Sequence, residues 1–150
     1  MVNQTATKDL IVNEKLQRRM QMDAPITITL KFSTELVTSF QGWGNRNAAK
    51  RAEEIRSEIE KKVDNAEVKI SVTDVIMSHN GVNGKFEPFT NAVISVKGSV
   101  SEHFDDDMSD YHRECIARRH LDDLIRSFIE NEEDAYRTNT LISASRKRIA

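Results

Sequence analysis

The stretch ITITLKF, Ile26 to Phe32, decides the class of fold to which this chain belongs. Apolar residues occupy every second position in it: Ile26, Ile28, Leu30 and Phe32. This alternation is typical of a β-strand that buries one face and exposes the other. Pro25, directly before the stretch, prevents a helix from continuing into it. The sequence therefore predicts a half-buried strand here.

Helical segments are predicted on both sides of this strand. Residues 8–22 carry apolar side chains four positions apart, at Val12, Leu16 and Met20, so we expect an N-terminal helix. From Asn47 onward the apolar period is again helical. One side of this second helix is formed by Ala48, Ala52, Ile55, Ile59 and Val63.

Two further strands and a last helix are predicted downstream. Residues 67–77 alternate until about Asp74, where a change of phase predicts a bulge or bend. Two Asn-Gly pairs in residues 79–88 predict a hairpin, and residues 89–100 alternate again. The segment 105–137 has helical spacing. Its expected inward side chains are Tyr111, Cys115, Ala117, Leu121, Leu124, Ile125 and Phe128.

These elements predict a single α+β domain with the order α-β-α-β-β-α. A crossover followed by a hairpin and a helix is the split β-α-β arrangement of ferredoxin-like folds. We therefore expect a three-stranded antiparallel sheet, with the first strand beside the third and both helices on one face. Residues 1–24 would be a helical segment and residues 25–136 the core. Residues 137–150 would form a basic tail or a fourth strand at the sheet edge.

Charge is distributed unevenly along the 150 residues. The net charge of -2 is the sum of +3 in residues 1–62, -1 in residues 63–101, -8 in residues 102–134 and +4 in residues 135–150. No stretch is long and apolar enough to cross a membrane, and the single cysteine excludes an internal disulfide. We expect a cytoplasmic protein with no membrane partner.

The stretch FQGWGNRNAAKR, Phe40 to Arg51, permits two interpretations. Glycines before a helix can bring backbone N–H groups close to a phosphate, with Trp43 stacking on a base and Arg46, Lys50 and Arg51 adding charge. Alternatively, the two glycines turn the chain and an asparagine caps the helix. The spacing matches no phosphate-binding motif, so we favour the turn and keep nucleic-acid binding as the alternative.

No group of residues has the spacing of a catalytic or metal site. His112 and Cys115 lie three positions apart, but zinc would need further ligands from distant positions such as His79 or His103. The aspartates at 105–107 and 110 lack the glycine and glutamate of a calcium loop. We therefore expect a protein that is not an enzyme and uses no metal or cofactor.

The acidic segment favours a role in protein binding. We expect the contact residues to be Asp122, Asp123, Glu130 and Glu133, which would attract a basic partner protein. We also expect a homo-oligomer, because the acidic and basic blocks of two copies complement each other. A regulatory or inhibitory role, or a small part in an assembly, would fit. The alternative is a nucleic-acid-binding module that uses Trp43, Arg46, Lys50 and Arg51 with Arg146, Lys147 and Arg148 of the tail.

Overall fold

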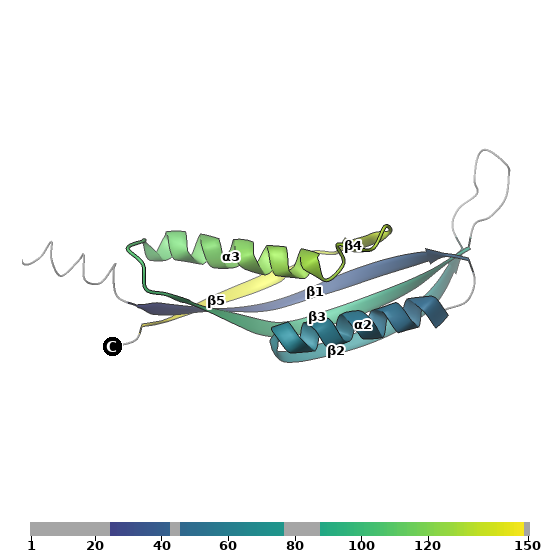
Figure 1. The fold of residues 1–150 in the computed structure, drawn as a ribbon, viewed down its shortest axis with the longest axis horizontal. Helices are drawn as coiled ribbons and strands as arrows, with labels where there is room; N and C mark the ends of the chain where they lie inside the picture. The colour runs from purple at the N-terminus through teal and green to yellow at the C-terminus, as the bar shows by residue number, and fades with distance from the viewer. Residues whose placement is uncertain (1–24, 43–45, 77–87, 149–150) are drawn as a thin grey trace, which may run out of the picture.

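A computed structural model describes residues 25–42, 46–76 and 88–148 as a long antiparallel sheet with two helices (Figure 1). The elements in chain order are β1 (Ile26–Gln41), α2 (Arg46–Lys62), β2 (Asp64–Ile76), β3 (Pro88–Phe104), α3 (Asp110–Ser127), β4 (Ala135–Arg137) and β5 (Leu141–Arg148). The strand order is β2-β3-β1-β4, and β5 also pairs with β1. β1 is therefore the central strand, with β3 along one side and β4 and β5 in succession along the other.

The predicted ferredoxin-like arrangement with the order α-β-α-β-β-α is wrong. The described residues follow the order β-α-β-β-α-β-β, and the sheet has five strands instead of three or four. The difference arises after α3, where the chain returns twice to the free edge of β1 instead of ending in a helix. The helix predicted at residues 8–22 and the turn predicted within residues 79–88 lie outside the described residues, except for Pro88, which begins β3.

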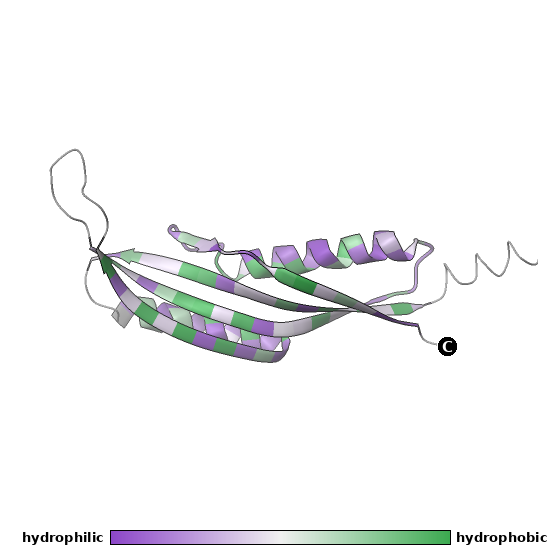
Figure 2. Ribbon diagram, turned by 180° about the vertical axis from the view of Figure 1, so that it is seen from behind, coloured by the Kyte–Doolittle hydropathy of each residue, from purple (hydrophilic) through white to green (hydrophobic). Residues whose placement is uncertain are grey.

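One face of the sheet is buried under both helices. Along β1, the even-numbered side chains from Ile26 to Thr38 are buried, as the alternation at Ile26–Phe32 predicts. They join one core cluster with residues of both helices, and Figure 2 shows hydrophobic and hydrophilic bands alternating along the strands. β1 runs to Gln41, well past the predicted end, because Thr34 and Thr38 take core-facing positions that the apolar pattern does not mark.

The predicted apolar side of α2 is confirmed. Ala48, Ala52, Ile55, Ile59 and Val63 are all buried. Figure 1 shows α2 running along one half of the sheet, and it contacts β1, β2 and β3. The 3.6-residue period of the sequence thus determined which side of this helix would face the sheet.

The last helix is shorter than predicted, and its buried side differs in part. α3 begins after Ser109, whose side chain accepts a hydrogen bond from the backbone N–H of His112. Its fully buried positions, four residues apart, are Arg113, Ala117, Leu121 and Ile125. Tyr111 is 76% exposed and Cys115 is also exposed, so the prediction that both face inward is wrong. Arg113 occupies the inward position because Asp106 and Asp110 neutralise it.

A bulge occurs at the start of β2 and not near Asp74, where it was predicted. The pairing with β3 shifts register between Asp64 and Glu67, and Asn65 has a φ of 52°. Gly98 of β3 lies opposite this irregularity. A Cβ atom at Gly98 would lie 2.3 Å from Cγ1 of Val63, so only glycine lets the two segments approach this closely.

The C-terminal segment forms an edge strand. β5 pairs with β1 from Ile26↔Arg148 to Ser33↔Leu141, and β4 pairs with Leu36–Thr38 of β1. The connection between β4 and β5 is held to β1 by the hydroxyl groups of Thr34 and Thr140, which lie 2.9 Å apart. The sequence left an edge strand and a disordered tail as alternatives, and the edge strand is the one found.

Candidate interaction surfaces

The cations of β5 face the acidic first half of α3 within the same chain. Arg146 donates a hydrogen bond to Glu114, with Nη2 and Oε2 2.5 Å apart, and Arg148 pairs with Asp110. The hydrogen bond from Arg146 lowers the pKa of the Glu114 carboxyl, and the same bond raises the pKa of Arg146. These opposite charges therefore complement one another inside one molecule.

Lys147, the third cation of the proposed nucleic-acid surface in this tail, lies apart from Arg146 and Arg148. Neighbouring residues of a strand point to opposite faces, so Lys147 is on the face that the helices leave uncovered. Its side chain is exposed. The three tail cations consequently do not form one continuous patch.

The four predicted acidic contact residues differ in whether they already form an ion pair. Asp122 pairs with Arg126 of the same helix, at 3.2 Å, and with Arg137 of β4. Asp123, Glu130 and Glu133 are exposed and form no ion pair with any residue that the structure describes. Of the four predicted contact residues, these three are available to an incoming cation without breaking an ion pair between described residues.

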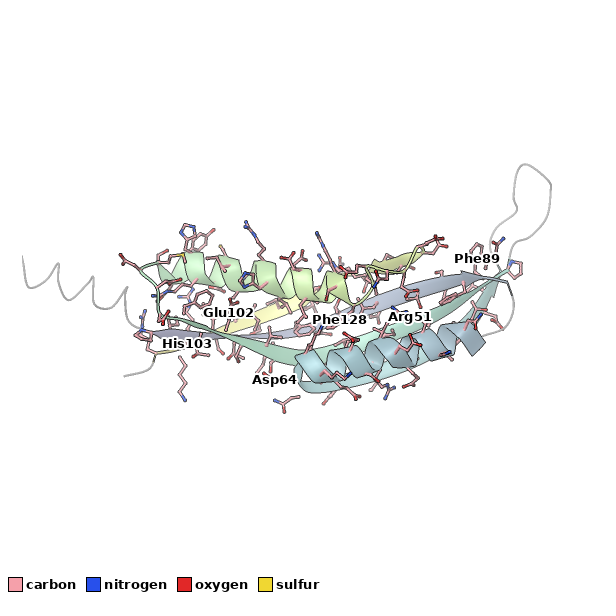
Figure 3. All side chains as sticks on the ribbon, in the orientation of Figure 1. Arg51, Asp64, Phe89, Glu102, His103 and Phe128 are labelled. Atoms are coloured by element: carbon pink, nitrogen blue, oxygen red, sulfur yellow. The ribbon has the colours of Figure 1, made fainter. Side chains whose placement is uncertain are left out.

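A groove of about 400 Å³ lies between α2 and the end of α3, and one of these three carboxylates, Glu130, is part of its lining. Ile55 and Phe128, which are almost completely buried, supply its apolar part. Its polar lining consists of Arg51, Glu54, Glu58, Lys62, Ser127, Glu130 and Asn131. Figure 3 shows Arg51 of α2 and Phe128, directly after α3, between the two helices. Asp123 precedes Ser127 by one helical turn and therefore lies on the same side of α3.

Arg51 links the two sides of this groove. Its guanidinium donates hydrogen bonds to Glu54, at 2.6 Å, and to Glu132, which follows α3. The bonds to Glu54 and then to Glu132 raise the pKa of Arg51. The pairing of Arg51 with Glu132 could not be predicted from the sequence, because 81 residues separate the two and no local pattern joins them.

The structure describes the stretch around the tryptophan only on its two sides, with a bend at Gly42 before it. Gly42 has a φ of 96°, a conformation that favours glycine, and its N–H donates to the carbonyl oxygen of Pro88. The hydroxyl of Thr90 lies 3.0 Å from the carbonyl oxygen of Gly42. Trp43 lies outside the described residues, and α2 begins at Arg46. Of the other two proposed cations, Lys50 is exposed, whereas Arg51 is engaged as described above.

The described histidines and the cysteine do not converge. His120 lies 2.7 Å from Glu102, and His103 lies 3.4 Å from the hydroxyl of Thr27. His112 and Cys115 are exposed on α3, and His79 lies outside the described residues. Within residues 25–42, 46–76 and 88–148, no three or more His, Cys, Asp or Glu side chains are arranged to hold a metal ion. No helix in these ranges is long and apolar enough to cross a membrane.

No protein-family model matches the chain, and no curated protein sequence matches it. Of the surface features described above, the groove beside α2 combines an apolar part with Glu130, a carboxylate that forms no ion pair with a described residue, and this combination suits a basic amphipathic segment.

Proposed function

We propose that this protein acts by binding another protein, and that the groove between α2 and the end of α3 receives a basic, partly apolar segment of that partner. The observation that carries this proposal is that three of the four predicted contact carboxylates, Asp123, Glu130 and Glu133, are exposed and form no ion pair with a described residue, and that Glu130 lines the groove. The remaining carboxylates of α3, Asp110, Glu114 and Asp122, are paired with arginines.

The chemistry of such an interface follows from the groove. Glu130 in the groove lining, together with the exposed Asp123 and Glu133, would attract lysines or arginines of the partner, and the small exposed part of Phe128 would contact an apolar side chain. Charges at a rim mainly raise the association rate and select the partner, whereas apolar contacts hold it. The protein would thus work as a regulator or as a component of an assembly, without catalysing a reaction.

Charge reversal at the rim tests this proposal. The variant Asp123→Lys/Glu130→Lys/Glu133→Lys is compared with Glu35→Lys/Glu60→Lys/Glu67→Lys, which makes the same change in net charge at exposed positions away from the groove. Partners are captured from a nuclease-treated extract. We expect the first variant to lose a partner that the second retains. Equal capture by both variants would contradict the proposal.

Hydrogen exchange locates the contact independently of charge. With a captured partner bound, we expect slower amide exchange in α2 and in residues 128–134, because the bound segment would cover both sides of the groove. Slower exchange confined to the uncovered sheet face or to β5 would show that the partner binds elsewhere.

Self-association through β5 is a second part of the proposal. Among the described residues no strand pairs with the outer edge of β5, so its outward N–H and C=O groups are available to a strand of a second copy. Leu141, at the beginning of β5, is 72% exposed. Light scattering at several protein concentrations measures this directly. A mass equal to that of one chain at every concentration would contradict the proposal that the protein self-associates.

A further inference from the structure

A second cavity lies on another side of α3, away from the acidic groove. It has a volume of about 620 Å³ and is enclosed by α3 and by the connection between β4 and β5. Leu121, Ile125 and Ile142 form its apolar floor. The polar lining consists of Arg118, Arg119, Asp122, Arg137, Thr138, Asn139 and Thr140. A volume of this size lies within the range of about 300–1,000 Å³ that small-molecule sites occupy.

The lining of this cavity is positively charged. It contains three guanidinium groups and one carboxylate, so its formal charge is positive by two. Asp122 pairs with Arg137, and Arg118 pairs with Glu114 at 3.2 Å, outside the lining. Arg119 is exposed and forms no hydrogen bond or ion pair with a described residue. The guanidinium of Arg119 can therefore bind an anion without breaking a hydrogen bond or ion pair to a described residue.

The wall opposite α3 is held in place by hydrogen bonds to β1. The N–H of Thr138 donates to the carbonyl oxygen of Glu35 at 2.9 Å, and the hydroxyl of Thr140 lies 2.9 Å from that of the buried Thr34. Both ends of the short connection are thus anchored to the central strand. Because this wall is already fixed, less conformational entropy is lost when a ligand binds.

We propose that this cavity binds a small organic molecule that carries a phosphate group. Arg119 of α3 and Arg137 of β4, which is also paired with Asp122, both line the cavity and would hold the phosphate, because guanidinium groups match the geometry of phosphate oxygens. The organic part would lie on Leu121, Ile125 and Ile142. A free phosphate ion would leave most of the cavity unfilled, so the organic part is required for tight binding. The proposal does not rest on the protein-binding groove, which uses other residues.

Calorimetric titration with a defined set of compounds tests the proposal. The compounds are phenyl phosphate, adenosine monophosphate, inorganic phosphate and the uncharged parents phenol and adenosine. We expect at least one of the two esters to bind, inorganic phosphate to bind more weakly, and the uncharged parents not to bind. Failure of both esters to bind at about 5 mM, the millimolar range of weak affinity, would overturn the proposal. So would equal affinity for inorganic phosphate and the esters.

A matched pair of variants assigns the binding to this cavity. Arg119→Ala removes a lining guanidinium that has no described partner, whereas Arg56→Ala removes an arginine of α2 that is not part of the lining. We expect Arg119→Ala to weaken ester binding about tenfold, the loss of one charge-assisted contact, and Arg56→Ala to change it little. Thermal unfolding verifies that both variants fold. Unchanged binding by folded Arg119→Ala would show that the cavity is not the site.

Discussion

A hydrogen bond of 2.5 Å between Arg146 of β5 and Glu114 of α3 joins these two elements, although the two residues lie 32 positions apart in the sequence. This bond lowers the pKa of Glu114, and Arg118 contributes to the same effect. The basic tail and the acidic helix are therefore partners within one chain. Their charge complementarity, which the sequence suggested for two separate copies, holds β5 against α3.

The first prediction concerns this pair and pH. Because the pKa of Glu114 is lower in the folded protein, the carboxylate stabilises the fold above its ordinary pKa of 4.5, and the contribution disappears as pH falls through the lowered value. We expect Glu114→Gln to reduce the free energy of unfolding by about 0.5–1 kcal/mol near pH 7, as for a partly exposed ion pair, and not near pH 2. Urea unfolding at both pH values measures this. Glu133→Gln, whose carboxylate has no described partner, should show no such difference.

The second prediction concerns Gly98. In Gly98→Ala the new methyl group would collide with Val63 and approach the carbonyl oxygen of Asp64 to 3.1 Å. We expect a loss of about 1–3 kcal/mol in the free energy of unfolding, typical of overpacking. Gly42→Ala is the comparison, because nothing lies within 4 Å there and only the positive φ is unfavourable. A cost at Gly98 no greater than at Gly42 would contradict the steric explanation.

The third prediction concerns the buried charge of Arg113. Its side chain is fully buried and contacts Asp106, at 3.0 Å, and Asp110. Arg113→Ala leaves Asp106 without its cation and opens a cavity, whereas Asp110 keeps Arg148, so we expect a loss of about 3–5 kcal/mol. Arg126→Ala, in which an exposed arginine of the same helix is removed, should cost less than about 1 kcal/mol. Chemical denaturation measures the free energy of unfolding of both variants. Similar losses would show that the burial of Arg113 does not contribute to stability.

The fourth prediction compares two leucines. Leu121 is 1% exposed between α3 and the sheet, whereas Leu141 is 72% exposed. We expect Leu121→Ala to lower the free energy of unfolding by about 2–5 kcal/mol, because it leaves a cavity in the core. Leu141→Ala should change it by no more than about 0.5 kcal/mol. A large loss in Leu141→Ala, measured at a concentration where the protein self-associates, would indicate that this residue is buried between copies.

The candidate surfaces could be predicted from the sequence only in part. The acidic character of residues 102–134 is visible as composition, but the composition does not tell which carboxylates are neutralised. Asp122 and Asp123 are neighbours in sequence, and yet only Asp122 meets Arg137. Successive residues of a helix point about 100° apart, so their partners depend on which elements pack on each side. The arginine-lined cavity has no signal in the sequence, because its walls come from α3 and from the β4–β5 connection.

The sequence by itself determined the elements whose side chains repeat with a regular period. The alternation at Ile26–Phe32 and the helical spacing from Ala48 to Val63 each identify a buried side, since that period follows from local backbone geometry. Only the tertiary structure decided that Thr34 and Thr38 extend the buried face of β1, that Arg113 enters the core, and that β4 and β5 complete the sheet. Each of these depends on neighbours distant in sequence, because a polar side chain can be buried, and a short strand can be stable, only where such neighbours supply partners.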